Sequence, residues 1–355
     1  MPARLTRPEL STDEGGLWSL MDRQETQLRR SPFAVRDPQL NEYVQGITCR
    51  LAREHCADIR VYVVHTPLFN ANMAPNGMMQ VWTGLMLRVE NEAQLAAVLG
   101  HEIGHYLARH SVERMRDVKS RAAFGQFMGL FGVAGAVGQL AVIASLFAYS
   151  RDQEREADAI GATLMQQAGY DTAEASKVWG NLLLEIQARP GYDEGRSSPM
   201  FATHPSPTER QETLKLLAEL NPGGRTDEQT WQAKTAPFML NWLKDETKRG
   251  QHEESVALLT RMIGHAPERA EFRFARGEVY RLRGSGSDAD AALADYQSAV
   301  KAGNAPAETY RGLGIVYRQR SDAAAARENF QRYLEAAPQA PDSAMIKSYL
   351  EELGP

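Results

Sequence analysis

The sequence contains little cysteine and no dense run of basic residues, and both absences limit what the protein can be. Two cysteines in 355 residues exclude a small disulfide-stapled scaffold. The net charge of −5, without Lys and Arg interleaved with aromatic residues, gives no indication of a nucleic-acid partner. The hydrophobic fraction of 43% still suffices to build cores, and the length predicts two or three domains.

The N-terminal residues 1–30 also lack the apolar core of a secretory signal. Either the protein is therefore cytosolic, or a targeting segment was removed before this chain begins. No strongly acidic or basic tail is present.

The two cysteines, Cys49 and Cys56, lie at the end of a helix predicted over residues 38–54. In one unbroken helix their Cα atoms would be about 10.5 Å apart, beyond the ~7 Å limit of a disulfide. A strand is predicted over residues 59–64, however, so we expect the helix to end near Glu54 and Cys56 to fold back. A disulfide suited to an oxidising compartment and a pair of buried thiols both fit this sequence.

The most informative motif is His101-Glu102-Ile103-Gly104-His105, in which two histidines stand four residues apart. On a helix these two side chains share one face and can reach a single ion. Glu102 then projects beside them, toward a bound water. This spacing is typical of zinc metalloproteases, in which a carboxylate that is not a ligand acts as general base.

A catalytic zinc site needs a third protein ligand, and the sequence offers one in Glu154-Arg155-Glu156-Ala157-Asp158. Glu154 and Asp158 stand four residues apart and share a face of a predicted helix. Glu154 could complete a site of two histidines and one glutamate. Asp158 could accept a hydrogen bond from the free N–H of a ligand imidazole and so orient that ring.

Together these motifs resemble the M48 family of zinc metallopeptidases, and within it the periplasmic BepA-like members that carry C-terminal tetratricopeptide repeats. Three further segments extend the resemblance, which covers roughly residues 20 to 220. They are residues 72–77, 81–85 and 203–210.

The resemblance implies one Zn²⁺ per chain, held by His101, His105 and Glu154, with Glu102 as the general base. It also implies a role near the metal for His204, which either occupies the open zinc position at rest or hydrogen-bonds the tetrahedral intermediate.

Other residues near these motifs are predicted from their spacing. His204 precedes a proline in a polar segment. From this pattern alone, it can also be a solvated loop residue. Arg210 fits a structural salt bridge and a substrate contact equally. His110, nine residues after His101, is expected to point away from the metal and lie at the surface.

Residues 59–64 and 78–82 are predicted strands, separated by the turn signal Ala74-Pro75-Asn76-Gly77. Strand, turn, strand and metal-binding helix form the mixed core expected of zincins. An edge strand in such a core can bind an extended peptide by β-augmentation, although an ordinary interior strand fits the same pattern. The predicted substrate-binding residues are Gly77, Met78, Met79, Gln80 and Val81.

Residues 122–148 are almost uncharged and long enough to span a bilayer, for which about 20 apolar residues suffice. Five glycines interrupt them, and a spanning helix would place His105 and Glu154 on opposite sides of a membrane. We therefore predict a helical hairpin that covers the metal cleft or dips into a membrane surface, with a buried core helix as the alternative. Residues 186–208 are predicted to be a loop beside the cleft.

The C-terminal part contains a tetratricopeptide pattern. Its signature positions are Tyr310, Leu313, Gly314, Tyr317, Ala326, Phe330 and Pro338. A looser copy precedes it, running from Gly277 to Pro306. Stacked helical pairs of this kind form a curved solenoid that commonly binds protein segments.

The predicted architecture is thus an α+β zincin-like metallopeptidase domain over residues 1–225, followed by an all-α tetratricopeptide-like solenoid over 226–355. The predicted function is that of a zinc endopeptidase acting on protein substrates in cell-envelope or outer-membrane quality control, in the bacterial periplasm. Outer-membrane assembly partners would bind the repeats, and peripheral membrane contact is part of this prediction. The alternative is a chaperone or assembly scaffold whose metal site is plugged by His204.

Overall fold

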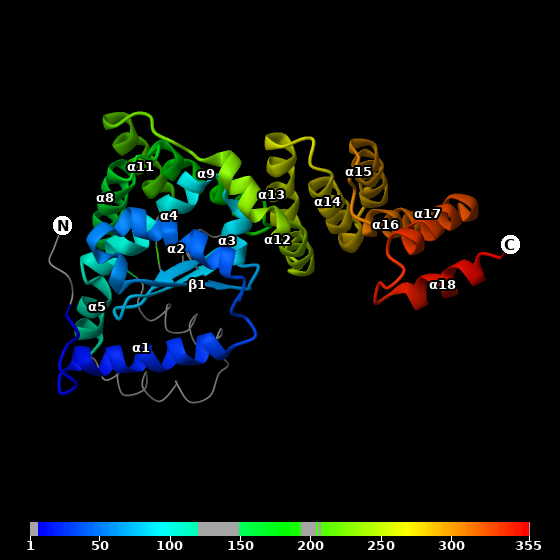
Figure 1. Ribbon diagram of the computed structural model, residues 1–355. Helices are drawn as coiled ribbons and strands as arrows, with labels where there is room; N and C mark the ends of the chain where they lie inside the picture. The colour runs from blue at the N-terminus through cyan, green and yellow to red at the C-terminus, as the bar shows by residue number, and fades with distance from the viewer. Residues whose placement is uncertain (1–5, 120–148, 193–203, 205–206, 355) are drawn as a thin grey trace. The chain divides into compact units, whose positions relative to one another are not determined.

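Figure 1 shows a computed structural model of the chain, in which residues 6–119, 149–192, 204 and 207–354 are described. The chain divides into two compact units. The first comprises residues 1–186 and 191–242, and the second comprises residues 187–190 and 243–355. The division falls within a long helix, whereas composition placed the domain boundary at 225/226, which stays a prediction.

The first unit combines a small sheet with helices on both of its faces. Its elements are α1 (Asp13–Arg30), α2 (Pro38–Ala52), the 3₁₀ helix η1 (Arg53–Asp58), β1 (Arg60–Val64), β2 (Ala71–Met73), β3 (Met78–Trp82), α3 (Thr83–Arg88), α4 (Glu92–Leu107), α5 (His110–Lys119), α8 (Arg151–Gln167), α9 (Ala173–Gln187), α11 (Pro207–Leu220) and α12 (Glu228–Lys248), of which the last continues into the second unit.

The sheet described in this unit has the strand order β1-β3-β2. β1 runs parallel to β3, with Arg60 opposite Met78, and β2 runs antiparallel to β3, with Asn72 opposite Gln80. The two strands predicted from alternation are confirmed. β2 was not predicted as a strand, because a segment of three residues is too short to show alternation.

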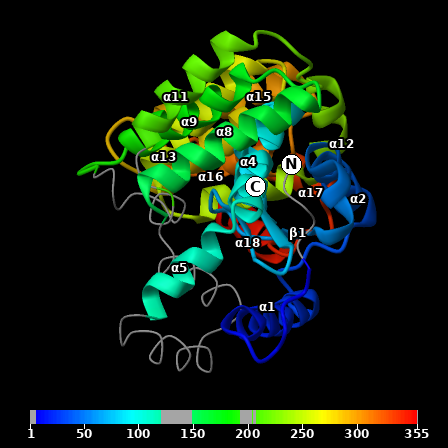
Figure 2. The same cartoon turned by 90° about the vertical axis from the view of Figure 1, so that its left-hand side faces the viewer.

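Helices cover both faces of the sheet: α1 lies on one side, and α2 and α4 lie on the other (Figures 1 and 2). Apolar residues of α1 pack against alternate residues of the strands, as the period-2 alternation of a strand requires. This layer contains Leu17, Leu20, Met21 and Leu28 of α1 together with Val64, Met78 and Trp82 of the sheet.

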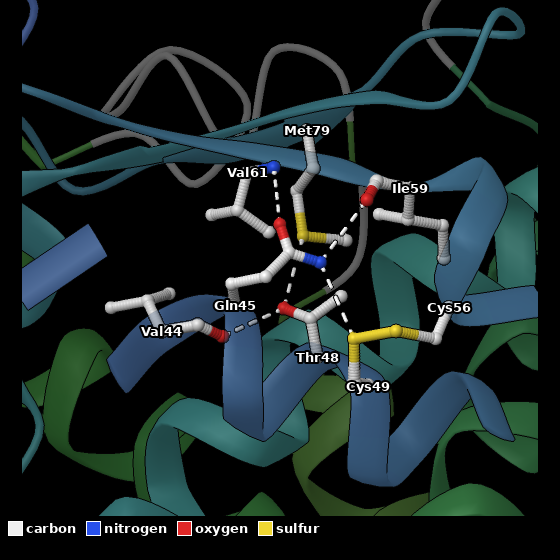
Figure 3. Close-up of a disulfide and its surroundings, with 8 residues drawn as sticks. All are labelled: Val44, Gln45, Thr48, Cys49, Cys56, Ile59, Val61 and Met79. Atoms are coloured by element: carbon white, nitrogen blue, oxygen red, sulfur yellow. Dashed lines mark hydrogen bonds between the residues drawn. A yellow bond between two sulfur atoms is a disulfide. The ribbon is translucent and has the colours of Figure 1, made fainter. Parts of the chain in front are cut away.

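The outer edge of β1 is closed by amide side chains of α2. Gln45 accepts a hydrogen bond from the Val61 N–H at 3.0 Å and donates to the Ile59 carbonyl at 3.1 Å (Figure 3). Asn41 accepts from the Val63 N–H at 3.3 Å. Residues 33–35 pair with the end of the same strand, where the Val35 N–H bonds the Val63 carbonyl at 2.9 Å. Together these groups occupy the positions that a further strand would need on this edge.

A disulfide joins Cys49 near the end of α2 to Cys56 in η1 (Figure 3). The α-helix ends at Ala52, and Arg53 adopts a positive φ of 52°, which turns the chain back. The Cα atoms of the two cysteines are therefore only 4.6 Å apart. The disulfide alternative of the sequence analysis is confirmed, and the pair of free thiols is wrong.

The second unit is built of consecutive helices that pack on their neighbours in the chain. After the end of α12 they are α13 (His252–His265), α14 (Ala270–Arg283), α15 (Asp288–Ala302), α16 (Glu308–Gln319), α17 (Ala323–Ala336) and α18 (Ser343–Glu352). The signature residues Gly314 and Phe330 meet where α16 packs on α17, since a Cβ on Gly314 would lie 2.4 Å from the Phe330 ring. The assignment to the tetratricopeptide class stays a prediction.

Two predictions concern segments outside the described part of the chain. The apolar hairpin over 122–148 lies there entirely, and most of the loop predicted over 186–208 does too. Within the described residues, no helix combines the length and the apolar character that crossing a bilayer requires.

Candidate metal centre

The first two site residues lie on α4, where the predicted helix is confirmed. Asn91 caps its N-terminus by accepting a hydrogen bond from the Gln94 N–H. His101 and His105 follow one turn apart, both almost fully buried. Their Nε2 atoms are 3.0 Å apart, so both rings aim at one point.

The third predicted ligand lies on α8. This helix begins with a capping box, in which Ser150 and Gln153 bond each other's backbone N–H groups. Glu154 follows in the first turn and is 1% exposed. Its Oε1 lies 3.4 Å from the His105 Nε2, and its Oε2 lies 3.6 Å from the His101 Nε2.

Glycines allow α4 and α8 to cross closely enough for these residues to meet. A Cβ on Gly104 would lie 2.7 Å from the Ala157 carbonyl oxygen, and one on Gly161 would lie 2.9 Å from the His101 nitrogen. In both positions the obstacle is backbone, which has no rotamer by which to yield. The close crossing brings the face that carries Glu154 against the face that carries the two histidines.

His204 completes the cluster. Its Nδ1 lies 3.1 Å from the His101 Nε2 and 2.9 Å from the Glu154 Oε1. The side chain is 3% exposed, so the interpretation of His204 as a solvated loop residue is wrong. Burial lowers the pKa of His204, but the Glu154 and Glu102 carboxylates together outweigh that effect and the net shift is upward.

The spacing and chemistry of these four residues suit zinc. One atom from each of His101, His105, Glu154 and His204 lies within 4.8 Å of every other. Four ligands about 2.0–2.1 Å from a tetrahedral zinc are separated from one another by about 3.3 Å. Nitrogen and oxygen atoms of these side chains are 2.9 to 3.6 Å apart, on both sides of that value. Three imidazoles and a carboxylate are ordinary zinc donors.

Glu102 lies beside this cluster without belonging to it. Its Oε1 is buried and has no hydrogen-bond partner among the described residues, and it lies 3.6 Å from the His204 Nε2. A backbone hydrogen bond from Met73 reaches the same carboxylate. Burial raises the pKa of Glu102 to about 7, where a carboxylate can both take up and release a proton near neutral pH.

Asp158 and Arg210 support His101 from behind. Asp158 Oδ1 lies 2.8 Å from the His101 Nδ1, as the sequence predicted for its role in orienting that ring. Arg210 bonds both oxygens of Asp158, at 2.6 and 2.9 Å, and its Nη1 lies 3.0 Å from the Glu154 Oε2. Its guanidinium also stacks over Trp179 at 3.9 Å.

The positive charge of Arg210 affects the pKa values of both Asp158 and His101. Burial raises the pKa of Asp158, but Arg210 and His101 outweigh that effect and lower it to about 2. Burial and the Arg210 charge lower the pKa of His101 to about 4, which keeps the imidazole neutral, as a ligand must be. Arg210 is 2% exposed and bonds other protein groups, so the salt-bridge interpretation fits it better than a substrate contact.

Two residues around His105 were missed by sequence reasoning. His110 is 2% exposed rather than at the surface, and its Nδ1 lies 2.9 Å from the His105 Nδ1, so that prediction is wrong. The reason is that α4 ends at Leu107, and helical spacing no longer applies beyond it. Tyr149 stacks on His105 with ring centroids 3.8 Å apart, and no sequence signal marked it.

The predicted substrate strand, Gly77 to Val81, needs correction. Residues 78–81 belong to β3, the central strand, which already pairs with β1 and β2. An extended peptide cannot add to a strand paired on both sides. The outer strand beside α4 is β2. Hydrogen bonds from Ala74 to Met78 and from Trp82 to Asn70 leave the backbone groups of the alternate residues 71 and 73 facing away from β3.

A histidine pair on α4, a glutamate on α8 and a second buried carboxylate beside them are the groups of a metallopeptidase centre. Residues 34–218 match peptidase family M48, and this chain belongs to that family. Its members use zinc.

Curated relatives agree with this assignment. The chain is 34% identical to the mitochondrial metalloendopeptidase OMA1 of Arabidopsis thaliana over 161 residues, which are 45% of this chain and 31% of that protein. It is 28% identical to the beta-barrel assembly-enhancing protease of Escherichia coli K12 over 227 residues, 58% of this chain and 45% of the relative. It is 32% identical to the metalloprotease YcaL of the same strain over 152 residues, 41% and 57% of the two chains. The chain thus spans about a third to just over half of these relatives.

Proposed function

We propose that the protein is a zinc-dependent endopeptidase whose metal ligands are His101, His105 and Glu154 and whose general base is Glu102. The observation that carries this proposal is the convergence of the ligand atoms beside the buried Glu102 carboxylate, whose Oε1 has no hydrogen-bond partner among the described residues. When bound, zinc supplies a Lewis acid that polarises the scissile carbonyl and acidifies a water molecule.

In this proposal Glu102 takes the proton of the attacking water and delivers it to the leaving amine. Its raised pKa suits both transfers. Asp158 holds His101 in the tautomer that directs Nε2 to the metal, and Arg210 fixes the carboxylates of Glu154 and Asp158 in place.

The substrate would bind as an extended strand along β2. The backbone groups of residues 71 and 73 face away from β3, and the N–H of Met73 reaches Glu102. A peptide paired with β2 therefore passes the general base. The opposite edge of the described sheet is closed by Asn41 and Gln45, which leaves β2 as the strand for addition.

Replacing Glu102 tests the general base. Glu102→Gln keeps the size of the side chain but cannot accept the proton, so zinc content should stay at one per chain while casein cleavage falls about 10²–10⁴-fold. Asp152→Asn, a change of an exposed carboxylate on α8, is the matched control and should leave both unchanged. Retained cleavage by Glu102→Gln would remove Glu102 from its role.

For His204 we propose that it occupies the open metal position at rest and leaves it when substrate binds. Its contacts with His101 and Glu154 support this role. If His204 only inhibits, His204→Ala should cleave casein faster than the wild type. If it also stabilises the intermediate, the variant should bind zinc but cleave more slowly.

The alternative function, a scaffold that binds clients through the second unit while the metal site stays plugged, predicts cleavage by neither protein under any condition. Casein turnover by the wild type and by His204→Ala therefore separates the two functions.

We propose the cell envelope, and the periplasm of a bacterium in particular, as the location. The Cys49–Cys56 disulfide fits an oxidising compartment, and the Escherichia coli relative is named for enhancing beta-barrel assembly. Outer-membrane assembly partners would then bind the helical repeats. Thiol labelling of protein extracted from cells under acid quench tests the location: both cysteines should resist alkylation until a reductant is added.

A further inference from the structure

We propose that His110 is a positioning residue for the zinc ligand His105. It acts through a chain of hydrogen bonds that runs from the His105 Nδ1 through both nitrogens of His110 to Glu156. This inference rests on the proposed zinc site, and it assigns a role to a buried histidine that the proposed reaction does not use.

Two interatomic distances define this series of hydrogen bonds. The Nδ1 atoms of His105 and His110 are 2.9 Å apart, and the His110 Nε2 lies 3.3 Å from a Glu156 oxygen. His110 is buried, whereas the Glu156 carboxylate is 61% exposed, so the chain leads from the centre of the site to solvent.

The positions of the hydrogens show which group donates in each hydrogen bond. If His105 binds zinc through Nε2, its Nδ1 carries the hydrogen and must donate it. The His110 Nδ1 is then the acceptor, which leaves the hydrogen of a neutral His110 on Nε2. That hydrogen in turn points at Glu156, a carboxylate that accepts. Each contact thus has one donor and one acceptor, with both imidazoles neutral.

The turn after α4 brings His110 into this position. Leu107 ends the helix, and Arg109 adopts a left-handed conformation with a φ of 60°. The chain reverses there, and α5 begins with His110 beside the last turn of α4. On a continued helix, a residue five positions after His105 would lie about 140° around the axis and could not reach its ring.

A second contact fixes the plane of the same ring. Tyr149 stacks on His105 with an interplanar angle of 18°, and the Tyr149 hydroxyl lies 3.0 Å from the Ser111 Oγ. Ser111 directly follows His110. The start of α5 therefore holds His105 both at its Nδ1 and, through Tyr149, across its face. His101 receives corresponding support from Asp158.

Two variants of equal size separate the hydrogen bond from the packing of the ring. In His110→Asn, the Oδ1 is bonded to Cγ, as the histidine Nδ1 is, and can accept from His105. His110→Leu has nearly the same shape without an acceptor. Apo forms of the wild type and of both variants are titrated with zinc against a chromophoric chelator, and the absorption spectrum of bound Co²⁺ is recorded.

We expect His110→Leu to bind zinc about 10–100-fold more weakly than the wild type, as is usual when the partner of a ligand histidine is lost. His110→Asn should stay closer to the wild type in both zinc affinity and Co²⁺ spectrum. Unfolding of the apo proteins, followed by tryptophan emission, shows whether both variants fold.

Equal zinc affinity in all three proteins would overturn the proposal. Equal weakening in both variants would assign the effect to the lost ring and overturn it as well. Failure of the wild type itself to bind zinc would instead contradict the proposed function, so the two failures are distinguishable.

Discussion

Both units of this protein have glycines where helices pack, but the glycines lie against backbone in the first unit and against aromatic rings in the second. In the first unit, a Cβ on Gly104 of α4 would meet a backbone carbonyl oxygen of α8. In the second unit, a Cβ on Gly277 or Gly314 would meet the ring of Tyr296 or Phe330. A ring can tilt, whereas a helix backbone cannot. The crossing in the first unit is therefore the more tightly constrained of the two, and a functional site needs its groups held to within about 0.5 Å.

The ion pairs of the two units also differ, in how deeply their arginines are buried. Arg210 in the first unit is 2% exposed and bonds Asp158 and Glu154 beside the metal ligands. Arg311 in the second unit also links two carboxylates, Glu278 and Asp342, but 22% of its side chain is exposed. Water can replace the partners of Arg311 and cannot replace those of Arg210. We infer that the first unit depends on individual contacts and the second on the sum of many similar ones.

Fluorescence can separate the stabilities of the units. All five tryptophans of the chain lie within residues 1–186 and 191–242, so tryptophan emission reports unfolding of the first unit. Hydrogen exchange of peptides from residues 243–355 reports the second.

The largest effect should come from Arg210. Arg210→Met leaves Asp158 and Glu154 buried without their cation, and breaking a buried pair in this way costs about 3–5 kcal/mol. The midpoint of tryptophan emission in urea should fall accordingly. Arg311→Met is the matched change in the second unit and should cost about 1 kcal/mol or less, measured by hydrogen exchange. Similar losses in both units would break the comparison.

Removal of zinc comes next. A ligand at a hundred times its dissociation constant stabilises the folded state by about 2.7 kcal/mol. Dialysis against a chelator should therefore lower the urea midpoint of the first unit, and zinc should restore it. Exchange rates within residues 243–355 should not change, because the described cluster of ligands lies in the first unit. Protection lost equally in both units would mean that they unfold together.

Reduction of the disulfide should have an effect of similar or slightly smaller size. The Cys49–Cys56 link spans seven positions, and closing so short a loop contributes about 2–3 kcal/mol. Dithiothreitol should lower the tryptophan midpoint of the wild type. The double variant Cys49→Ser/Cys56→Ser should start at the lower value and not respond to the reductant. A response of that variant would show that the disulfide is not the cause.

The smallest effects should come from single methyl groups at the helix crossings. Overpacking of this kind costs about 1–3 kcal/mol, and we expect Gly104→Ala to lie at the upper end because Ala157 cannot yield. Gly314→Ala should lie at the lower end, since the Phe330 ring can shift. Only Gly104→Ala should also weaken zinc binding.

Two glycines in open positions serve as controls for these variants. A Cβ on Gly46 of α2 would meet nothing closer than 3.8 Å, and one on Gly264 of α13 would meet nothing within 4 Å. Alanine at either position should stabilise its helix by up to about 1 kcal/mol. A loss at these positions of the size seen in Gly104→Ala would contradict the role assigned to the helix crossing.

Elements with a local cause could be predicted from the sequence, and those with a distant cause could not. The helix over 38–54 and the strands over 59–64 and 78–82 are confirmed, because each follows from spacing within a few residues. The same spacing left a disulfide and a pair of thiols open for Cys49 and Cys56, and the chain reversal at Arg53 decided for the disulfide. The place of β3 at the centre of the sheet depends on β2, which is too short to show a pattern. The strands that flank β3 could therefore be identified only from the tertiary structure.

At the site the same distinction holds. The spacing of His101 and His105 and the charged start of α8 specified which side chains share a helix face, since helical geometry converts sequence distance directly into position. The burial of His110 and the stacking of Tyr149 follow from a reversal at Arg109 and from the packing of α5.

The sequence by itself determined which residues on α4 and α8 are candidate metal ligands, because their types and their i, i+4 spacing lie within single helices. Only the tertiary structure decided which strand edge lies beside Glu102, how closely α4 and α8 approach, and what supports each ligand ring. Those features depend on contacts between residues far apart in the chain, whose distances no local pattern encodes.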